Sequence, residues 1–404
     1  MKPIKITIQG GYLDCQLYRG WLYLWTFDGR LCVYDWERLI DSLNVMEIDR
    51  LALRLSFKEG SYLYRHHVLE IFQDSEFKDL LVEKFNNLNV YRFVISERSL
   101  RQFLIGEMDT PSLSLPIDTE IYNSILYFAT DNGLFKTNAH KTEGNPVSSK
   151  PTKMWDARIL SLKANNYPRM AISAGDDGLY EMSISKEEVR YDELKEVERN
   201  INLISDKHSS FSNYSNLSIY SSSLSSKSYL ALFAWKESEE YAQKFRRVYT
   251  KILDSSVIFG DESDNLSWGV DGKIFRATPN GFNIIEFNNN SREQYFFKKK
   301  DYKKQLNRGS VIGGTSAYFG NIVEYENGLT VIQTDGERLS IFQPVTRWRV
   351  YPRSNNYANQ LHVLLDNRMD IYAFNHDYFI PQKDKELGID FFDDETRGGF
   401  KRRK

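Results

Sequence analysis

The stretch Met170–Met182, which reads MAISAGDDGLYEM, carries the clearest structural signal in the sequence. An apolar run leads through the small residues of Ser173–Gly175 to Asp177 and Gly178, and a second apolar run follows. Glycine adopts positive φ angles without steric penalty, and aspartate tolerates them while its side chain bonds to the local backbone. The stretch therefore predicts a β-hairpin with a tight turn at Asp177 and Gly178.

The same order of apolar strand, Asp-Gly or Asn-Gly turn and apolar strand recurs along the chain. Further copies are Leu22–Tyr34, Ile125–Thr137, Leu266–Arg276 and Leu329–Phe342, and a weaker copy with Asn367 in the glycine position is Leu361–Phe374. The residues assigned to structural turns are Asp28, Gly29, Gly133, Asp177, Gly178, Asp271, Gly272, Asp335 and Gly336. Gly133 and Gly178 are 45 residues apart, and two of the other gaps are close to twice that length.

Two further stretches are candidates for degenerate copies inside the long gaps. Leu51, Leu53 and Leu55 alternate and lead toward Val68–Phe72, and Tyr229–Trp235 leads through a polar turn to Phe245–Leu253. Repeats of this length built from short strands are typical of β-propellers. The sequence thus predicts an all-β fold, a single closed β-propeller of about seven four-stranded blades with short helical insertions. Eight blades are the alternative.

The two ends of the chain have different expected roles. Ile4, Ile6 and Ile8 alternate with polar residues, which predicts a half-buried strand. We expect this strand to close the ring by pairing with the blade that contains Met369–Phe374, because closure removes exposed sheet edges. The propeller is assigned to residues 1–380, and residues 381–404 are predicted to form a flexible charged tail.

Two insertions interrupt the repeats. The first is helical, is placed at about residues 74–105 in the second blade, and contains a helix over Asp74–Leu88 whose apolar stripe either packs on the propeller or docks a partner. A short helix or turn is predicted over Asp35–Leu43. The second insertion is the charged and serine-rich segment at about residues 185–228, in which Ser209–Ser228 is predicted to form a polar outer strand plus loop rather than a phosphorylated linker.

Neither the net charge nor the hydrophobicity of the whole chain indicates binding to nucleic acid or to a membrane. The formal net charge is −2, and no run of 18 apolar residues occurs. The N-terminus lacks the apolar region of a signal peptide, so the cytoplasm is the expected location. Cys15 and Cys32 are expected to be reduced thiols on neighbouring strands of one hairpin.

We find no motif that specifies a catalytic, cofactor or metal site. The histidines lack metal-ligand spacing, and phosphate-loop and nucleophile-elbow motifs are missing from the sequence. The recurring turn aspartates invite a second interpretation, a carboxylate cluster on one face that would suit a hydrolase or lyase. Turn chemistry explains each of these aspartates and is the favoured interpretation.

Two stretches combine basic and aromatic residues, Tyr295–Arg308 and Thr346–Arg353. If Thr346–Arg353 contains a strand, Arg347 and Arg349 share one face and Trp348 lies on the other. Such residues can contact nucleic acid or serve as protein-interface hot spots, and a plain solvated surface is the alternative. The candidate partner-binding residues are Arg347, Trp348, Arg349, Arg353, Lys298, Lys299, Lys300, Lys303 and Lys304.

The hairpins at Gly133, Gly178 and Gly272 resemble those of the WD40-like β-propeller superfamily, and the resemblance covers most of residues 1–380. The Gly-His and Trp-Asp blade signatures are missing, so the resemblance names no family within the superfold. It implies a rigid disc whose faces bind other macromolecules, usually proteins.

Three functional hypotheses follow. The first is a non-catalytic macromolecular interaction module, a scaffold or recognition subunit of a multi-protein complex with protein partners, no cofactor and no membrane association. The second is a nucleic-acid-contacting subunit that uses the basic-aromatic stretches. The third is a propeller hydrolase or lyase with clustered carboxylates in a pocket on one face.

Overall fold

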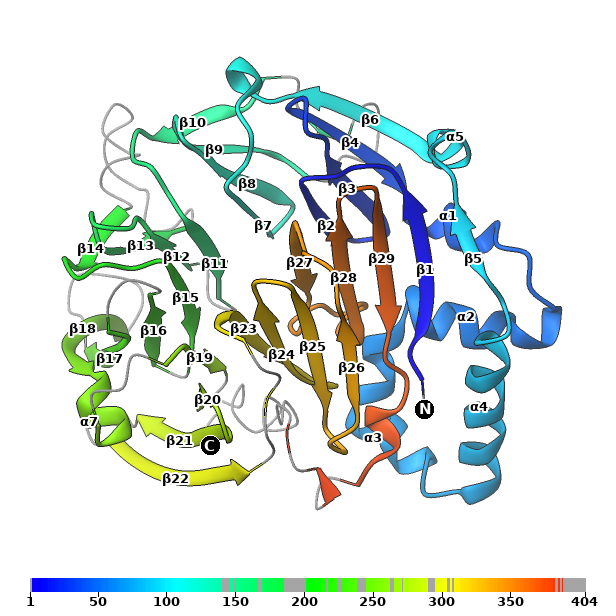
Figure 1. Cartoon of the computed structure of the whole chain (residues 1–404). Coiled ribbons are helices and arrows are strands. Elements are labelled where there is room, and N and C mark those ends of the chain that lie inside the picture. The colour runs from blue at the N-terminus through cyan, green and yellow to red at the C-terminus, as the bar shows by residue number, and fades with distance from the viewer. Residues whose placement is uncertain are drawn as a thin grey trace.

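Seven sheets form a ring, six of four antiparallel strands and one of five strands, which confirms the predicted propeller (Figure 1). The computed structural model describes residues 2–139, 146–147, 150–165, 169–184, 201–215, 217–223, 227–237, 245–261, 265–270, 272–289, 295–303, 306, 309–381, 384–385 and 387. The strands nearest the ring centre are the first strands of the blades, and those of neighbouring blades contact one another around most of the ring.

The first three blades follow the chain in order. The first blade consists of β2 (Asp14–Tyr18), β3 (Trp21–Trp25), β4 (Arg30–Asp35) and β6 (Leu104–Asp109). The second consists of β7 (Asp118–Tyr122), β8 (Ile125–Thr130), β9 (Gly133–Asn138) and β10 (Thr152–Trp155). The third consists of β11 (Ser161–Ala164), β12 (Arg169–Ser173), β13 (Leu179–Ser183) and β14 (Ile201–Ser205).

The next three blades repeat this meander. The fourth blade consists of β15 (Phe211–Tyr214), β16 (Ser218–Ser222), β17 (Tyr229–Glu237) and β18 (Phe245–Asp254), followed by the short helix α7 (Ser255–Phe259). The fifth consists of β19 (Ser267–Val270), β20 (Lys273–Thr278), β21 (Gly281–Asn289) and β22 (Tyr295–Lys303). The sixth consists of β23 (Val311–Ala317), β24 (Gly320–Tyr325), β25 (Gly328–Gln333) and β26 (Arg338–Ile341).

The seventh blade joins the two ends of the propeller. It consists of β27 (Arg347–Val350), β28 (Gln360–Leu365), β29 (Arg368–Ala373) and the N-terminal strand β1 (Ile4–Gln9), with β5 (Phe93–Ile95) as a fifth, parallel strand. Strand β1 pairs antiparallel with β29 from Ile4–Ala373 to Gln9–Arg368, so the predicted ring closure is confirmed. The isoleucines of β1 are almost fully buried, as their alternation predicts.

The predicted hairpins are all present, and their turns depend on glycine. The five turn glycines have positive φ angles, namely Gly29 (79°), Gly133 (120°), Gly178 (101°), Gly272 (81°) and Gly336 (81°). A Cβ atom added at Gly178 would lie 2.1 Å from the backbone oxygen of Ser205, so a side chain is excluded there by space as well as by φ.

The hairpins do not occupy one equivalent position in their blades, which corrects the assumption behind the carboxylate-cluster hypothesis. The turns at Gly29, Gly133 and Gly178 join second and third strands, whereas Gly272 follows a first strand and Gly336 precedes a fourth. In a meander, these two sets of turns lie at opposite ends of the strands. Asp28 and Asp177 are therefore on the opposite face from Asp335, and Asp271 lies outside the described residues.

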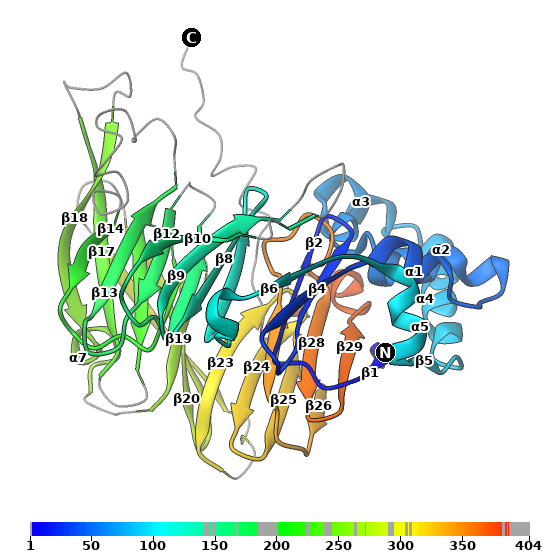
Figure 2. The same ribbon diagram turned by 90° about the horizontal axis from the view of Figure 1, so that it is seen from above.

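The helical insertion is longer than predicted and belongs to the first blade, between β4 and β6. It contains α1 (Trp36–Asp41), α2 (Arg50–Phe57), α3 (His66–Ile71), α4 (Ser75–Leu88) and α5 (Glu97–Leu100). These helices gather beside β1 and β29 on the outer side of the ring (Figures 1 and 2).

The leucines at positions 51, 53 and 55 were wrongly predicted to lie in a strand, as was Val68–Phe72. They fall in α2 and α3 because the buried positions of α2 are Ala52, Leu53, Ser56 and Phe57, a helical spacing, while Leu51 is 62% exposed. By contrast, Tyr229–Trp235 and Phe245–Leu253 do form the predicted strand pair, β17 with β18.

Two helices of the insertion begin with an aspartate cap. The side chain of Asp35 accepts a hydrogen bond from the Arg38 backbone N–H at the start of α1, and Asp74 does the same for Phe77 in α4. In α4, three residues of the apolar stripe are buried, Leu81, Phe85 and Leu88. Phe77 and Leu80 remain 44% and 53% exposed. Most of the stripe thus packs inward.

The serine-rich stretch was wrongly predicted to be an outer strand. It contributes β15 and β16, the two innermost strands of the fourth blade, and nearly all of its described serines are buried. The Oγ of Ser209 donates to Ser173 in the third blade at 2.9 Å, and Ser221 donates to Ser209 at 2.8 Å. These hydroxyls join the third and fourth blades through hydrogen bonds. Residues 185–200 of the charged segment lie outside the described residues.

Part of the predicted tail is packed on the propeller. The Lys385 Nζ atom lies 2.8 Å from the carboxylate of Asp377, and Leu387 is buried among residues of the fifth and sixth blades. Both positions depart from the expectation of a flexible tail. Residues 388–404 lie outside the described residues.

Candidate functional site at the mouth of the central channel

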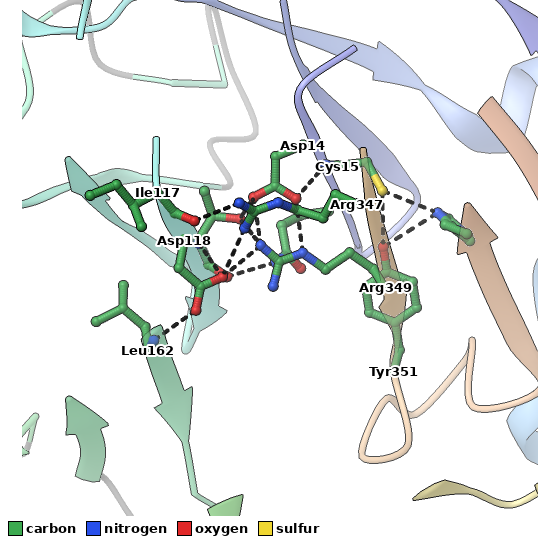
Figure 3. A network of polar contacts seen from close by, with 11 residues as sticks. Asp14, Cys15, Ile117, Asp118, Leu162, Arg347, Arg349 and Tyr351 are labelled. Carbon is green, nitrogen blue, oxygen red and sulfur yellow. Dashed lines mark hydrogen bonds and ion pairs between the residues drawn. The ribbon is translucent and has the colours of Figure 1, made fainter. Parts of the chain in front are cut away.

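Arg347 and Arg349 lie on β27 and point into the central channel, on the same face of the strand as predicted (Figure 3). Arg349 donates from Nε to one oxygen of Asp14 at 2.8 Å and from Nη2 to the other at 2.5 Å. Its Nη2 also donates to Asp118 at 2.7 Å. Asp118 accepts in turn from the backbone N–H of Leu162 at 2.7 Å. This network joins the seventh, first, second and third blades.

The pKa values of Asp14 and Arg349 show that their mutual attraction outweighs the effect of burial. Burial alone would raise the pKa of the Asp14 carboxyl, but Arg349 and Arg347 outweigh it and hold the pKa below its ordinary value. Burial alone would lower the pKa of Arg349, but the carboxylates of Asp14 and Asp118 raise it well above its ordinary value. Both groups are charged at neutral pH, and their charges compensate each other inside the ring.

A thiol, a phenol and an imidazole lie next to this network. The Cys15 Sγ atom is 3.7 Å from Nδ1 of His362 and 3.9 Å from the Tyr351 hydroxyl. Burial, aided by Asp14, raises the pKa of Cys15 to about 12, and burial lowers the pKa of His362 to about 3. The thiol and imidazole are thus neutral at pH 7, which does not suit a nucleophile activated by a base.

The thiols of Cys15 and Cys32 are both free and buried. They do not lie on neighbouring strands as predicted, because Cys15 pairs with Leu24 on β3 and Leu24 pairs with Cys32 on β4. The intervening strand separates the two side chains.

One end of the channel opens into a cavity of about 530 Å³. Every one of the seven first strands contributes to its lining, and so do the 352–357 segment after β27 and the helical insertion. We call this cavity the mouth. Its cationic lining residues are Arg19, Arg65, Lys163, Arg349 and Arg353, and its single carboxylate among the described lining residues is Glu120.

The mouth cations come from separate elements. Arg19 follows β2 and donates to the Ser124 hydroxyl at 3.2 Å. The Arg65 guanidinium lies 3.8 Å from the centre of the Tyr62 ring in the helical insertion. Lys163 lies on β11. None of these three residues belongs to a sequence motif or a run of basic residues, so no local pattern singles them out.

Glu120 opposes the positive charge of the mouth from β7. Burial raises the pKa of its carboxyl, while the charge of Lys163 acts in the opposite direction. The charges of Glu120 and Lys163 therefore interact across neighbouring blades.

Arg347 belongs to the channel network described above, and the other predicted partner-binding residues separate into three groups. Arg349 and Arg353 line the mouth, and Arg353 donates to the Ala164 backbone oxygen at 3.4 Å. Trp348 faces away from the channel, as predicted, and donates from its indole nitrogen to Glu324 at 2.7 Å. The lysines lie on β22, the exposed outer strand of the fifth blade, and comprise Lys298, Lys299, Lys300 and Lys303, while Lys304 lies outside the described residues.

An Asp-His-Ser arrangement on the opposite face has the residue types of a hydrolase catalytic triad. The His208 Nδ1 atom is 2.7 Å from Asp176, and its Nε2 atom is 3.0 Å from the Ser210 hydroxyl. However, the Asp176 side chain is 99% exposed, and the Ser210 backbone N–H donates to Ser222 rather than facing a substrate. We interpret the group as a clamp between the β12–β13 turn and the segment that leads to β15.

We expect His208→Ala to lower the free energy of unfolding by about 1 kcal/mol, because it removes a hydrogen bond to a charged group. Chemical denaturation measures this loss. We also expect a fluorophosphonate probe to leave Ser210 unlabelled in the wild-type chain. Labelling of Ser210 that disappears in His208→Ala would contradict the structural interpretation and favour the hydrolase.

Among the described residues, no group of three or more His, Cys, Asp or Glu side chains is arranged to hold a metal ion. Within the same part of the chain, no helix is both long enough and apolar enough to span a membrane.

Comparison with known proteins gives likenesses of fold only. No family model and no curated protein matches the sequence. Similar solved structures include the β-propeller domain of Myceliophteria thermophila Cps50 (Swd1), with 8% identity, coverage of 90% of this chain and 97% of that one, and a TM-score of 0.47. The WD40 propeller domain of Doa1 has 9% identity, covers 92% and 97%, and has a TM-score of 0.46. The strand order of the blades by itself establishes a seven-bladed β-propeller.

Proposed function

We propose that this chain is a non-catalytic interaction module, a scaffold or recognition subunit of a multi-protein complex, which binds its protein partner at the mouth. The observation that carries the proposal is the construction of the mouth. All seven blades contribute to one concave site, and five cationic residues line it against one carboxylate. A cavity of this size with convergent polar groups is typical of a binding site on a rigid scaffold.

The lining suits a peptide better than it suits nucleic acid. Side-chain amides at Asn123, Asn165 and Asn213 offer donors and acceptors that match a peptide backbone. The exposed lysines of β22 lie on an outer strand, where lysine blocks unwanted pairing with the sheet edge. Their position is thus explained without a nucleic-acid ligand.

Affinity purification from native lysate, with and without nuclease, tests the proposal. The variant Arg19→Glu/Arg65→Glu reverses two exposed charges at the mouth, and Lys298→Glu/Lys299→Glu makes the same change on β22. We expect the wild-type chain to retain a stoichiometric protein partner after nuclease treatment. The mouth variant should lose that partner and the β22 variant should keep it.

Two outcomes would contradict the proposal. A partner that the mouth variant retains in full would show that binding occurs elsewhere. Partners that disappear with nuclease, and with the β22 variant, would favour the nucleic-acid hypothesis. Thermal unfolding of each variant shows whether the fold is kept, which the exposure of the substituted side chains leads us to expect.

A further inference from the structure

We infer that the mouth recognises an acidic peptide segment, one that presents several Asp or Glu side chains to the channel. This inference rests on the proposed function and specifies its ligand. It begins from a difference between two sets of cations in the channel. The charge of Arg349 is compensated by Asp14 and Asp118. By contrast, Arg19 contacts the neutral side chains of Ser124 and Tyr18, and Arg65 contacts the neutral ring of Tyr62.

The distribution of these charges favours an extended ligand with several negative groups. Arg19 lies between β2 and β3, Arg65 precedes α3 in the insertion, and Lys163 lies on β11. A phosphate group is best held by donors that converge on one point. Cations on three separate elements are better matched by a chain of carboxylates. Each ion pair between a mouth cation and a ligand carboxylate would form at the edge of a cavity, where water screens the charges only in part.

The aromatic lining supports the same class of ligand. The Arg65 guanidinium lies 3.8 Å from the centre of the Tyr62 ring, and this cation–π contact restricts the arginine side chain. A preorganised guanidinium loses less conformational entropy when it binds a carboxylate.

Glu120 provides the sharpest test, because it is the single carboxylate among the described lining residues and would repel an acidic ligand. Its replacement by glutamine keeps the size and removes the charge. Since burial already disfavours the ionised form, we expect the folded state to tolerate Glu120→Gln. A variant that binds better cannot be explained by damage to the fold.

The probe is a fluorescein-labelled peptide in which glutamate alternates with glycine, and fluorescence anisotropy with the full chain measures its affinity. Two matched peptides carry glutamine or phosphoserine in place of each glutamate. A labelled oligothymidine serves as the nucleic-acid probe. We expect the glutamate peptide to bind at least about tenfold more tightly than the glutamine peptide at low salt, and the difference to shrink as salt rises. Phosphoserine and oligothymidine should bind more weakly than glutamate.

The variants give opposite expected effects. Glu120→Gln should tighten binding of the glutamate peptide by about threefold or more, and Arg19→Glu/Arg65→Glu should weaken it by at least about tenfold. The control Lys298→Glu/Lys299→Glu should leave it unchanged. Equal binding of the glutamate and glutamine peptides, a preference for phosphoserine or oligothymidine, or an unchanged affinity in Glu120→Gln would each overturn the inference.

The failure of this inference is distinguishable from failure of the proposed function. If the mouth variant loses the lysate partner while the glutamate peptide does not bind, the mouth is the interface and its ligand is not acidic. If the glutamate peptide binds but the mouth variant keeps the lysate partner, the proposed function is wrong, because the partner is held elsewhere.

Discussion

Replacement of Arg349 by methionine is expected to lower the free energy of unfolding by about 3–5 kcal/mol, the usual cost of removing one partner from a buried ion pair. The Asp14 side chain is completely buried and that of Asp118 is 9% exposed, so neither carboxylate can turn to water when the guanidinium is lost. Methionine keeps much of the side-chain volume, and the loss therefore reports on charge rather than on a cavity. Chemical denaturation measures it.

Arg347→Met is the matched control. This arginine is 25% exposed, and its nearest approaches to Asp14 and Asp118 are 3.6 and 3.4 Å. Both features weaken an ion pair, so we expect a clearly smaller loss of stability. An equal loss in the two variants would contradict the view that Arg349 holds the inner ring together.

The pH dependence of Arg349→Met provides a second check. In the wild-type chain the folded-state pKa of Asp14 is lowered, so its stabilising contribution is present above the ordinary aspartate pKa of about 4 and is lost as pH falls through the folded-state value. In the variant, a buried carboxylate without its guanidinium destabilises the fold while it is ionised. Protonation relieves that penalty, and the stability gap between wild type and variant should narrow as pH falls.

Turn chemistry and strand alternation are local properties, which explains why the hairpins and the closing strand could be predicted from sequence. The place of each hairpin within its blade could not. An Asp-Gly turn has the same local requirements after a first, second or third strand, so Gly178 and Gly272 look alike although they lie on opposite faces. The leucines near Leu53 were assigned to a strand for a similar reason. Their short run fits both the two-residue period of a strand and the longer period of a helix.

The candidate site was visible only in part for a different physical reason. Arg349 could be recognised as an unusual strand residue, but its partners Asp14 and Asp118 are hundreds of positions away in the chain. Arg65 is brought to the mouth by an insertion whose path the sequence does not reveal. The ring assembles a site from residues that carry no shared local pattern.

The seam of the ring is expected to be its most sensitive point, and Ile6→Ala tests this. Ile6 is fully buried and pairs with Ile371 on one side and Phe93 on the other. Truncation of a buried isoleucine to alanine costs about 2–5 kcal/mol through lost burial and the cavity that remains. Here the same change also loosens the strand that holds the two ends of the propeller together, so local opening should expose β29.

Ile172→Ala is the matched control, because Ile172 is equally buried on β12 in the third blade, whose strands are all supplied by one continuous part of the chain. We expect comparable losses in free energy of unfolding from the two substitutions. Hydrogen exchange should then separate them, with amides of β29 exchanging faster in Ile6→Ala and remaining close to wild type in Ile172→Ala. Equal acceleration in β29 would mean that the ring opens cooperatively. In that case the pairing of β1 with β29 would be no weaker than the interior of a blade, even though it joins residues from opposite ends of the chain and pays the larger loop-closure entropy.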